Sequence, residues 1–241
     1  MTEQVIRCLP AHRDGFIGDV ALLVADLVGK EGAVIGVDLN PELIKTARAR
    51  SAAAGFDSVS FVVGDAASVE LDRDIDAVVG RCVLFFAPEP AALVRRLTGH
   101  VRGGGIVAFQ EPANARLAPM SLPPSPLLEQ LWAWILETYR RAGIDQYMGL
   151  RLRTIFAEAG LPAPTMHLDA AAGGGPGWPG YEYMARLIRT ILPLITKLGV
   201  ATEDDVEIDT LADRLHAEIG DDGAAVTWGF ITAWAQHQIH P

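Results

Sequence analysis

A regular alternation of short apolar runs and helical patterns between Gly18 and Glu111 constrains the fold more than any other feature of the sequence. Residues 33–37 are apolar without interruption, as in a parallel strand covered on both faces. Asn40 and Pro41 follow this run as the N-cap and the first-turn proline of a helix. Strands separated by helices of this length require right-handed crossovers, so the sequence predicts an α/β fold with a doubly wound, mostly parallel sheet.

Further strands and helices are expected from apolar periodicity and from helix start and stop signals. The expected strands cover Val59–Val63, 77–79, 106–109, 165–168 and 224–234. The expected helices cover Asp19–Val28, 41–54, 90–97, 125–142, 150–159, 181–198 and 202–219. Gly103, Gly104 and Gly105 are expected to form the turn before the strand at 106–109.

The composition narrows the class of protein. The chain has 241 residues, 50% of them hydrophobic, which is enough for a sizeable core. Its formal net charge of −10 repels phosphate backbones and argues against nucleic acid as a partner. Cys8 and Cys82 are the only cysteines, too few for a disulfide framework or a Cys-built zinc site. No apolar run is long enough for a membrane span and no signal-like segment opens the chain, so we expect a cytoplasmic protein.

Polar groups follow three consecutive expected strands. Asp38 ends the strand at 33–37 and could accept hydrogen bonds from both hydroxyls of a ribose. After the next strand, Asp65 could accept an adenine amino hydrogen, and the backbone amide of Ala66 could donate to the ring. Arg81 follows the third strand. Ligands of open α/β sheets bind outside the carboxyl ends of the strands, so these residues jointly predict a nucleoside site, although each acid alone is as often a helix cap.

These stretches carry a family resemblance. The segments VIGVDLNPELIKTARA, FVVGDAAS, DAVVGRCVLFFAPEPAALVRRL and HVRGGGIVAFQEP, between Gly18 and Pro112, resemble class I S-adenosylmethionine-dependent methyltransferases. The similarity is greatest to the small-molecule type found among quinone-biosynthesis enzymes. The resemblance implies a Rossmann-like sheet of seven strands with an antiparallel last strand, for which residues 224–234 are the candidate, and inserted cap helices. It also implies S-adenosylmethionine as the cofactor.

The resemblance assigns roles to individual residues of the cofactor site. Asp38 would hold the ribose, and Leu39 would lie against the adenine. Asp65 and Ala66 would contact the edge of the adenine, and Arg81 would sit beside the methionine part.

The segment before the first helix departs from the family pattern, which is a strand followed by acid-x-Gly-x-Gly-x-Gly. Gly18 matches the last of these glycines, whereas Asp14 and Phe16 occupy the earlier glycine positions and His12 the acid position. The preceding strand would contain Pro10, which cannot donate to a central ladder. A side chain where the family needs bare backbone would obstruct the ligand.

Three explanations of this departure are open. The segment could be a divergence that weakens cofactor binding, or another loop geometry in which Gly15 and Gly18 flank the ligand. It could also come from a shifted reading frame or a misplaced start, which we favour because the rest of the chain keeps its strand-end residues.

Two other functions compete with the methyltransferase. Asp38 follows Gly18 by 20 residues, a spacing that also suits an NAD-dependent oxidoreductase, but the chain has no G-x-G-x-x-G motif. A non-catalytic binding or regulatory protein could have kept the fold and lost the cofactor.

Candidate substrate residues are Glu111, His167 and Tyr181. Glu111 could equally cap a helix or loop, and His167 fits a core or surface histidine better than a general base. Tyr181 belongs to a group of aromatic residues that could line an apolar pocket, although Trp132 of that group fits a packed helical stripe. No spacing of His, Asp or Glu supports a metal site, and the sequence shows no recognisable pattern of a Ser/His/Asp triad.

We therefore expect methyl transfer from S-adenosylmethionine to an O, N or C atom of a small, partly apolar metabolite. Such a transfer is a direct displacement, for which the protein must align the nucleophile, the methyl group and the sulfur and exclude water. The reaction therefore does not require a catalytic base. We expect a single domain, with a cofactor-binding half over residues 1–112 and a substrate half over 113–241. Cap helices at about 125–142 and 181–219 would shape the substrate pocket.

Overall fold

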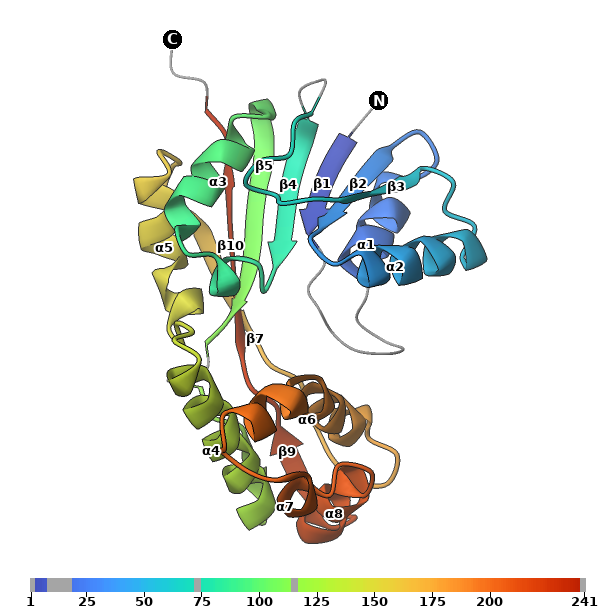
Figure 1. Cartoon of the computed structure of the whole chain (residues 1–241), viewed down its shortest axis with the longest axis vertical. Coiled ribbons are helices and arrows are strands. Elements are labelled where there is room, and N and C mark those ends of the chain that lie inside the picture. Colours follow the sequence, from blue (N-terminus) through green and yellow to red (C-terminus); the bar gives the residue numbers. More distant parts are fainter. Residues whose placement is uncertain (1–2, 8–18, 72–74, 114–116, 239–241) are drawn as a thin grey trace. The chain divides into compact units, whose positions relative to one another are not determined.

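The computed structural model describes residues 3–7, 19–71, 75–113 and 117–238 (Figure 1). The chain divides into two compact units. The first, here called the sheet unit, comprises Met1–Glu111, Gly149–His167 and Thr232–Pro241. The second, the helical unit, comprises Pro112–Met148 and Leu168–Ile231.

A seven-stranded sheet organises the sheet unit, in the order β3-β2-β1-β4-β5-β10-β7. Its strands are β1 (Glu3–Arg7), β2 (Ala33–Asp38), β3 (Val59–Val63), β4 (Ile75–Arg81), β5 (Val101–Pro112), β7 (Thr165–Asp169) and β10 (Phe230–Gln236). The pairs β1–β2, β1–β4, β2–β3 and β4–β5 are all parallel. The doubly wound, mostly parallel sheet expected from the sequence is therefore confirmed.

The first strand corrects one expectation. We expected a strand containing Pro10, but β1 ends at Arg7 and pairs on both sides with its neighbours in the centre of the sheet. The described residues of β1 do not include Pro10, which lies outside the part of the chain that the structure describes.

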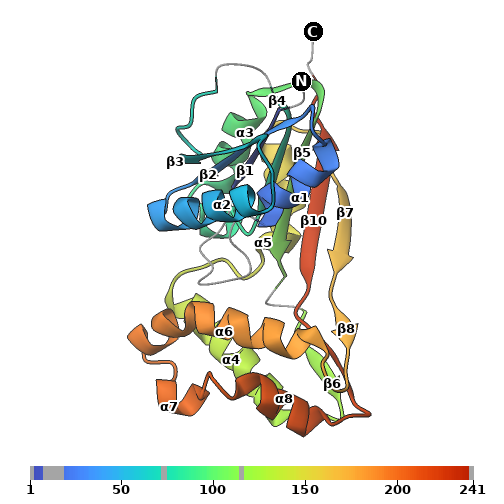
Figure 2. The same cartoon turned by 90° about the vertical axis from the view of Figure 1, so that its right-hand side faces the viewer.

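The last strand runs antiparallel to β5. Gly104 N near the start of β5 donates to His237 O just after β10, while the side chain of Gln110 near the end of β5 donates to Thr232 Oγ1 near the start of β10. Figure 2 shows β10 between β5 and β7. The single strand expected at 224–234 is wrong in its bounds, because this stretch is split into β9 (Ala224–Val226) and β10, which belong to different sheets.

The three glycines at 103–105 lie inside β5, so the turn expected there is wrong. Ile75 of β4 pairs with Val101 and Ala77 with Ile106, which leaves the glycines in a bulge of the ladder. Gly104 has φ 79°, and a Cβ on Gly105 would lie 2.7 Å from the carbonyl oxygen of Asp76. Glycine is thus required here by backbone conformation and by close packing of the neighbouring strand.

Helices of the sheet unit are α1 (Asp19–Val28), α2 (Pro41–Ala53), α3 (Pro90–Thr98) and α5 (Met148–Glu158), with a 3-10 turn η1 (Leu84–Phe86) after β4. Asn40 caps α2 as expected, because its side chain accepts from the amides of Glu42 and Leu43. The helices α1 and α2 bury a continuous apolar cluster against β2 and β3. Its members are Ala21, Val24, Ala25, Val34, Leu43, Ile44, Ala47 and Phe61.

The helical unit contains α4 (Pro126–Arg141), α6 (Pro179–Lys197), α7 (Glu203–Val206) and α8 (Leu211–Ile219), and a small antiparallel sheet. That sheet has the order β6-β9-β8, from β6 (Met120–Leu122), β9 and β8 (Ala172–Gly173). The single helix expected at 202–219 is wrong: Glu207 takes a left-handed conformation, φ 44°, and separates α7 from α8. Among the described residues, no helix has the length and apolar character to cross a bilayer.

Aromatic side chains form part of the core of the helical unit. The Trp132 and Trp228 rings stack with centroids 6.2 Å apart, and Trp228 Nε1 donates to the hydroxyl of Tyr183 over 3.2 Å. Trp132 is only 8% exposed, which confirms its interpretation as part of the packed stripe of α4.

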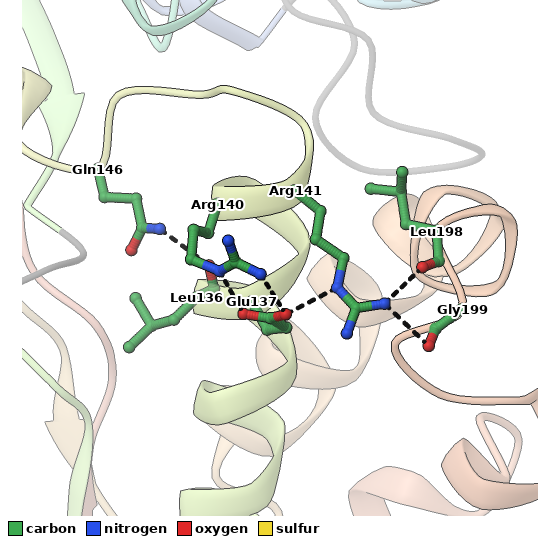
Figure 3. Close-up of polar contacts among 7 residues, drawn as sticks. All are labelled: Leu136, Glu137, Arg140, Arg141, Gln146, Leu198 and Gly199. Atoms are coloured by element: carbon green, nitrogen blue, oxygen red, sulfur yellow. Dashed lines mark hydrogen bonds and ion pairs between the residues drawn. The ribbon is translucent and has the colours of Figure 1, made fainter.

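An exposed cluster of charged side chains joins α4 to the end of α6 (Figure 3). Both carboxylate oxygens of Glu137 accept from Arg140 over 2.7 Å, and Arg141 Nε donates to the same carboxylate over 2.7 Å. Arg141 Nη1 donates to the carbonyl of Leu198 over 2.7 Å and to that of Gly199 over 3.2 Å. We call the contacts of Glu137, Arg140 and Arg141 the Glu137–Arg141 clamp. Through Arg141 they supply donors to carbonyl groups that the end of a helix leaves without partners.

Candidate functional site

The carboxyl ends of β3, β2 and β4 lie at one edge of the sheet, because these strands run in the same direction on either side of β1. Asp38 is the last residue of β2, Arg81 is the last of β4, and Asp65 follows the end of β3 by two residues. Asp38 pairs with Val63, and its carbonyl accepts from the amide of Gly64 over 2.9 Å. The polar groups that the sequence singles out are thus brought to the same edge, where an open α/β sheet binds its ligands.

The carboxylate of Asp38 is buried and oriented. The residue is 4% exposed, and Oδ1 accepts from the backbone amide of Asn40 over 2.8 Å. The same Asn40 caps α2, so the start of that helix and the direction of the Asp38 side chain are set by one short turn. Leu39, next in the chain, is 55% exposed and leaves an apolar surface beside this carboxylate.

Asp65 begins a tight turn after β3. Its Oδ1 accepts from the amide of Ala67 over 2.9 Å, and its carbonyl accepts from the amides of Ser68 and Val69. Asp65 is exposed, whereas Ala66 is buried. The turn therefore presents a carboxylate to solvent and keeps its backbone in a fixed conformation.

The chain after β4 is held in an uncommon conformation. Arg81 is half-buried, and Cys82 has φ 51°, a left-handed conformation that residues with a Cβ seldom adopt. Desolvation of the Cys82 thiol, and next the charge of Glu111, raise its pKa far above the ordinary value, against the lowering effect of Arg81. This thiol is therefore protonated at neutral pH and is a weak nucleophile.

Glu111 lies at the end of β5, next to β4, and is fully buried. Its Oε1 accepts from the amides of Val83 (2.9 Å) and Leu84 (2.8 Å), and its Oε2 accepts from Phe85 (3.2 Å). The carboxylate thus caps the start of η1, which is the structural alternative considered for this residue.

The other sequence-derived candidates lie elsewhere or outside the described residues. Gly18, with His12, Asp14 and Phe16 before it, falls in the undescribed segment 8–18. His167 is exposed on β7, the far edge strand of the sheet. Tyr181 is buried in the helical unit, edge-on to Trp178 with ring centroids 5.0 Å apart. Burial raises the pKa of its hydroxyl.

Two features of the site were missed or underweighted from sequence. The left-handed Cys82 has no signal in the residue type, because cysteine has no preference for that conformation. The triple contact of Glu111 depends on residues more than 25 positions earlier. In the part of the chain that the structure describes, no group of three or more His, Cys, Asp or Glu side chains could hold a metal ion.

A segment that includes β2 to β5 matches a known family. A family model described as a methyltransferase domain matches residues 17–160, more than half of the chain. The chain therefore belongs to the methyltransferase domain family, and its fold is that of the class I S-adenosylmethionine-dependent enzymes. This match favours the methyltransferase over the NAD-dependent oxidoreductase.

Characterised relatives match part of the chain. An arsenite methyltransferase of Halobacterium salinarum is 32% identical over 108 residues, which cover 42% of this chain and 28% of the relative. Aklanonic acid methyltransferase DauC of a Streptomyces species is 31% identical over 109 residues, which cover 44% of this chain and 50% of the relative. The alignments thus span half or less of these relatives' own length.

Solved structures share the fold across nearly the whole chain. A putative methyltransferase of Bacillus halodurans has a TM-score of 0.58 at 17% identity, covering 98% of this chain and 93% of its own. Phosphoethanolamine N-methyltransferase 2 of Haemonchus contortus, solved with S-adenosylmethionine, has a TM-score of 0.56 at 16% identity, covering 99% of this chain and 49% of its own. At these identities the likeness concerns the fold.

Proposed function

We propose that this protein transfers a methyl group from S-adenosylmethionine to an O, N or C atom of a small, partly apolar metabolite. One observation carries the proposal: the buried, oriented carboxylate of Asp38 ends β2 beside the Asp65 turn, in a chain that belongs to the methyltransferase family. A carboxylate oriented at the ligand edge of the sheet can accept hydrogen bonds from the hydroxyls of a ribose.

The residues of this edge fit the nucleoside half of the cofactor. Asp38 accepts from the ribose hydroxyls, Leu39 supplies apolar surface for the adenine, and Asp65 with Ala66 binds the adenine edge. Arg81 lies on the side of the methionine part. Gly18 is assigned to the same part by resemblance alone, since it lies outside the described residues. Bound S-adenosylmethionine supplies a methyl group on a positively charged sulfur, which is open to direct displacement.

The work of the protein in such a displacement is positioning rather than proton transfer. The strand-end residues hold the nucleoside in one orientation, which fixes where an acceptor must approach. The helices α4 and α6, within the expected substrate half 113–241, shape the acceptor pocket. Of the three candidate substrate residues, Glu111 already binds three backbone amides, so we keep His167 and Tyr181 as the substrate candidates of the proposal.

The acceptor itself does not follow from the relatives. The names of the two relatives specify arsenite and aklanonic acid, an inorganic anion and an organic acid. The alignments with these two relatives cover 42% and 44% of this chain. We therefore limit the proposal to a small, partly apolar acceptor.

Calorimetric titration with S-adenosylmethionine and S-adenosylhomocysteine, with NAD as the control ligand, tests the proposal. We expect roughly micromolar binding of the first two and none of NAD. Absence of binding to a protein shown to be folded would overturn the proposal and favour the non-catalytic alternative.

A further inference from the structure

The carboxylate of Glu111 holds the turn after β4, and Glu111 is not among the residues assigned to the cofactor. Glu111 is fully buried, and its two oxygens bind the three successive amides of Val83, Leu84 and Phe85. A negative charge removed from water is stable only where donors surround it, so this arrangement is specific to a carboxylate.

The held segment continues directly from the ligand edge. Arg81 ends β4, Cys82 has φ 51°, and the first of the three bound amides follows at Val83. The amide of Cys82 also donates to the carbonyl of Gln110 over 2.8 Å, so both sides of the left-handed residue are tied to the end of β5. A conformation of this kind persists only where the surrounding contacts enforce it.

We propose that Glu111 is a positioning residue for the cofactor site. By holding the backbone of residues 82–85, Glu111 fixes the orientation of Arg81, the last residue of β4. The inference rests on the proposed function, because Arg81 must face the cofactor for its direction to matter. A residue that served only to cap η1 would stabilise the fold without changing affinity for the cofactor.

Glu111→Gln separates these two roles. The amide oxygen of the substituted side chain can still accept hydrogen bonds, but its NH₂ group cannot accept from Phe85, and the charge is lost. We expect the affinity for S-adenosylhomocysteine to fall about tenfold or more, as for loss of one charge-assisted hydrogen bond.

The matched control is Thr98→Val in the crossover helix between β4 and β5. Thr98 is buried and its hydroxyl donates to the Val94 carbonyl over 2.8 Å, so this variant also loses a buried hydrogen bond. Thr98→Val should lower the melting temperature and leave the affinity unchanged. Equal affinity of Glu111→Gln and wild-type protein would overturn the inference, as would an equal loss in both variants.

A measurement on wild-type protein covers the case in which Glu111→Gln does not fold. If the turn and the cofactor are coupled, the cofactor must stabilise the turn as much as the turn stabilises the cofactor. Saturating S-adenosylhomocysteine should therefore slow hydrogen exchange at the amides of Val83, Leu84 and Phe85. Unchanged exchange in a protein that binds the ligand would overturn this inference alone, and absence of binding by wild-type protein would overturn the proposed function with it.

Discussion

Two glutamates, one in each unit, hold the end of a neighbouring segment and differ in almost every other respect. Glu111 in the sheet unit is fully buried and accepts from three backbone amides. Glu137 in the helical unit is partly exposed to solvent and accepts from two arginine side chains. The same chemical group thus serves in a protein interior and in water, and the environment determines how much each contact contributes to stability.

The donors explain the difference. Backbone amides are fixed by the chain, so Glu111 meets donors that lose little freedom on binding, and nothing replaces it when it is removed. Arginine side chains in the Glu137–Arg141 clamp are long and solvated, and water competes for every one of their contacts. The predictions below test this comparison, from the largest expected effect to the smallest.

Glu111→Ala should be the most destabilising change. It leaves three buried amides without an acceptor, and we expect a loss of about 3 kcal/mol or more in the free energy of unfolding. Urea denaturation followed by circular dichroism measures it. A loss below about 1 kcal/mol would mean that solvent reaches the turn and replaces the carboxylate.

Asp38→Ala should weaken binding of S-adenosylhomocysteine by about 1.5–3 kcal/mol, the range for a hydrogen bond to a charged group. Calorimetric titration gives the value. Asp57→Ala is the matched control. Asp57 is an exposed aspartate just before β3, at the amino ends of the strands and therefore away from the ligand edge. Unchanged affinity of Asp38→Ala would remove the assignment of this residue to the ribose.

Ser125→Ala should lower the stability of the helical unit by about 1 kcal/mol, as for other N-caps. The Ser125 hydroxyl accepts from the amide of Leu128 and donates to Glu218 Oε2 over 2.5 Å. Thr210→Ala is the comparison, because the Thr210 hydroxyl precedes α8 without capping it and donates instead to the Glu207 carbonyl at an exposed position. If both variants lost the same stability in thermal unfolding, the capping contact would not be the cause.

Glu137→Gln should have the smallest effect, below that of Ser125→Ala. Hydrogen bonds from Arg140 and then Arg141 lower the pKa of Glu137 from 4.5 to about 2. Because the folded-state pKa is the lower one, the stabilisation is complete above about pH 4.5 and is lost as the pH falls towards 2.

The difference in stability between wild-type protein and Glu137→Gln should therefore shrink as the pH falls from about 4.5 towards 2. Glu129→Gln, at an exposed position of the same helix, serves as the control for the removal of one carboxylate. A difference that grew on acidification would contradict the role of the clamp.

Sequence reasoning was most successful where the structure is local. The helix cap at Asn40 was placed from the chain alone, and the bounds of Asp19–Val28 and Val59–Val63 agree with α1 and β3. It failed where distant segments determine the structure: Gly103, Gly104 and Gly105 suggest a turn, yet they form a bulge within β5, whose residues on both sides pair with β4. The assignment of cofactor roles to Asp38, Asp65 and Arg81 stays a prediction until binding is measured.

The sequence by itself determined the α/β class, the order of most elements and the positions of polar groups at the ends of β2, β3 and β4, because strand and helix periodicity and capping depend on residues a few positions apart. Only the tertiary structure decided that residues 224–236 divide between two sheets and that Glu111 binds amides at Val83, Leu84 and Phe85. These contacts join residues far apart in the chain, and which partner a buried group finds depends on how the elements pack.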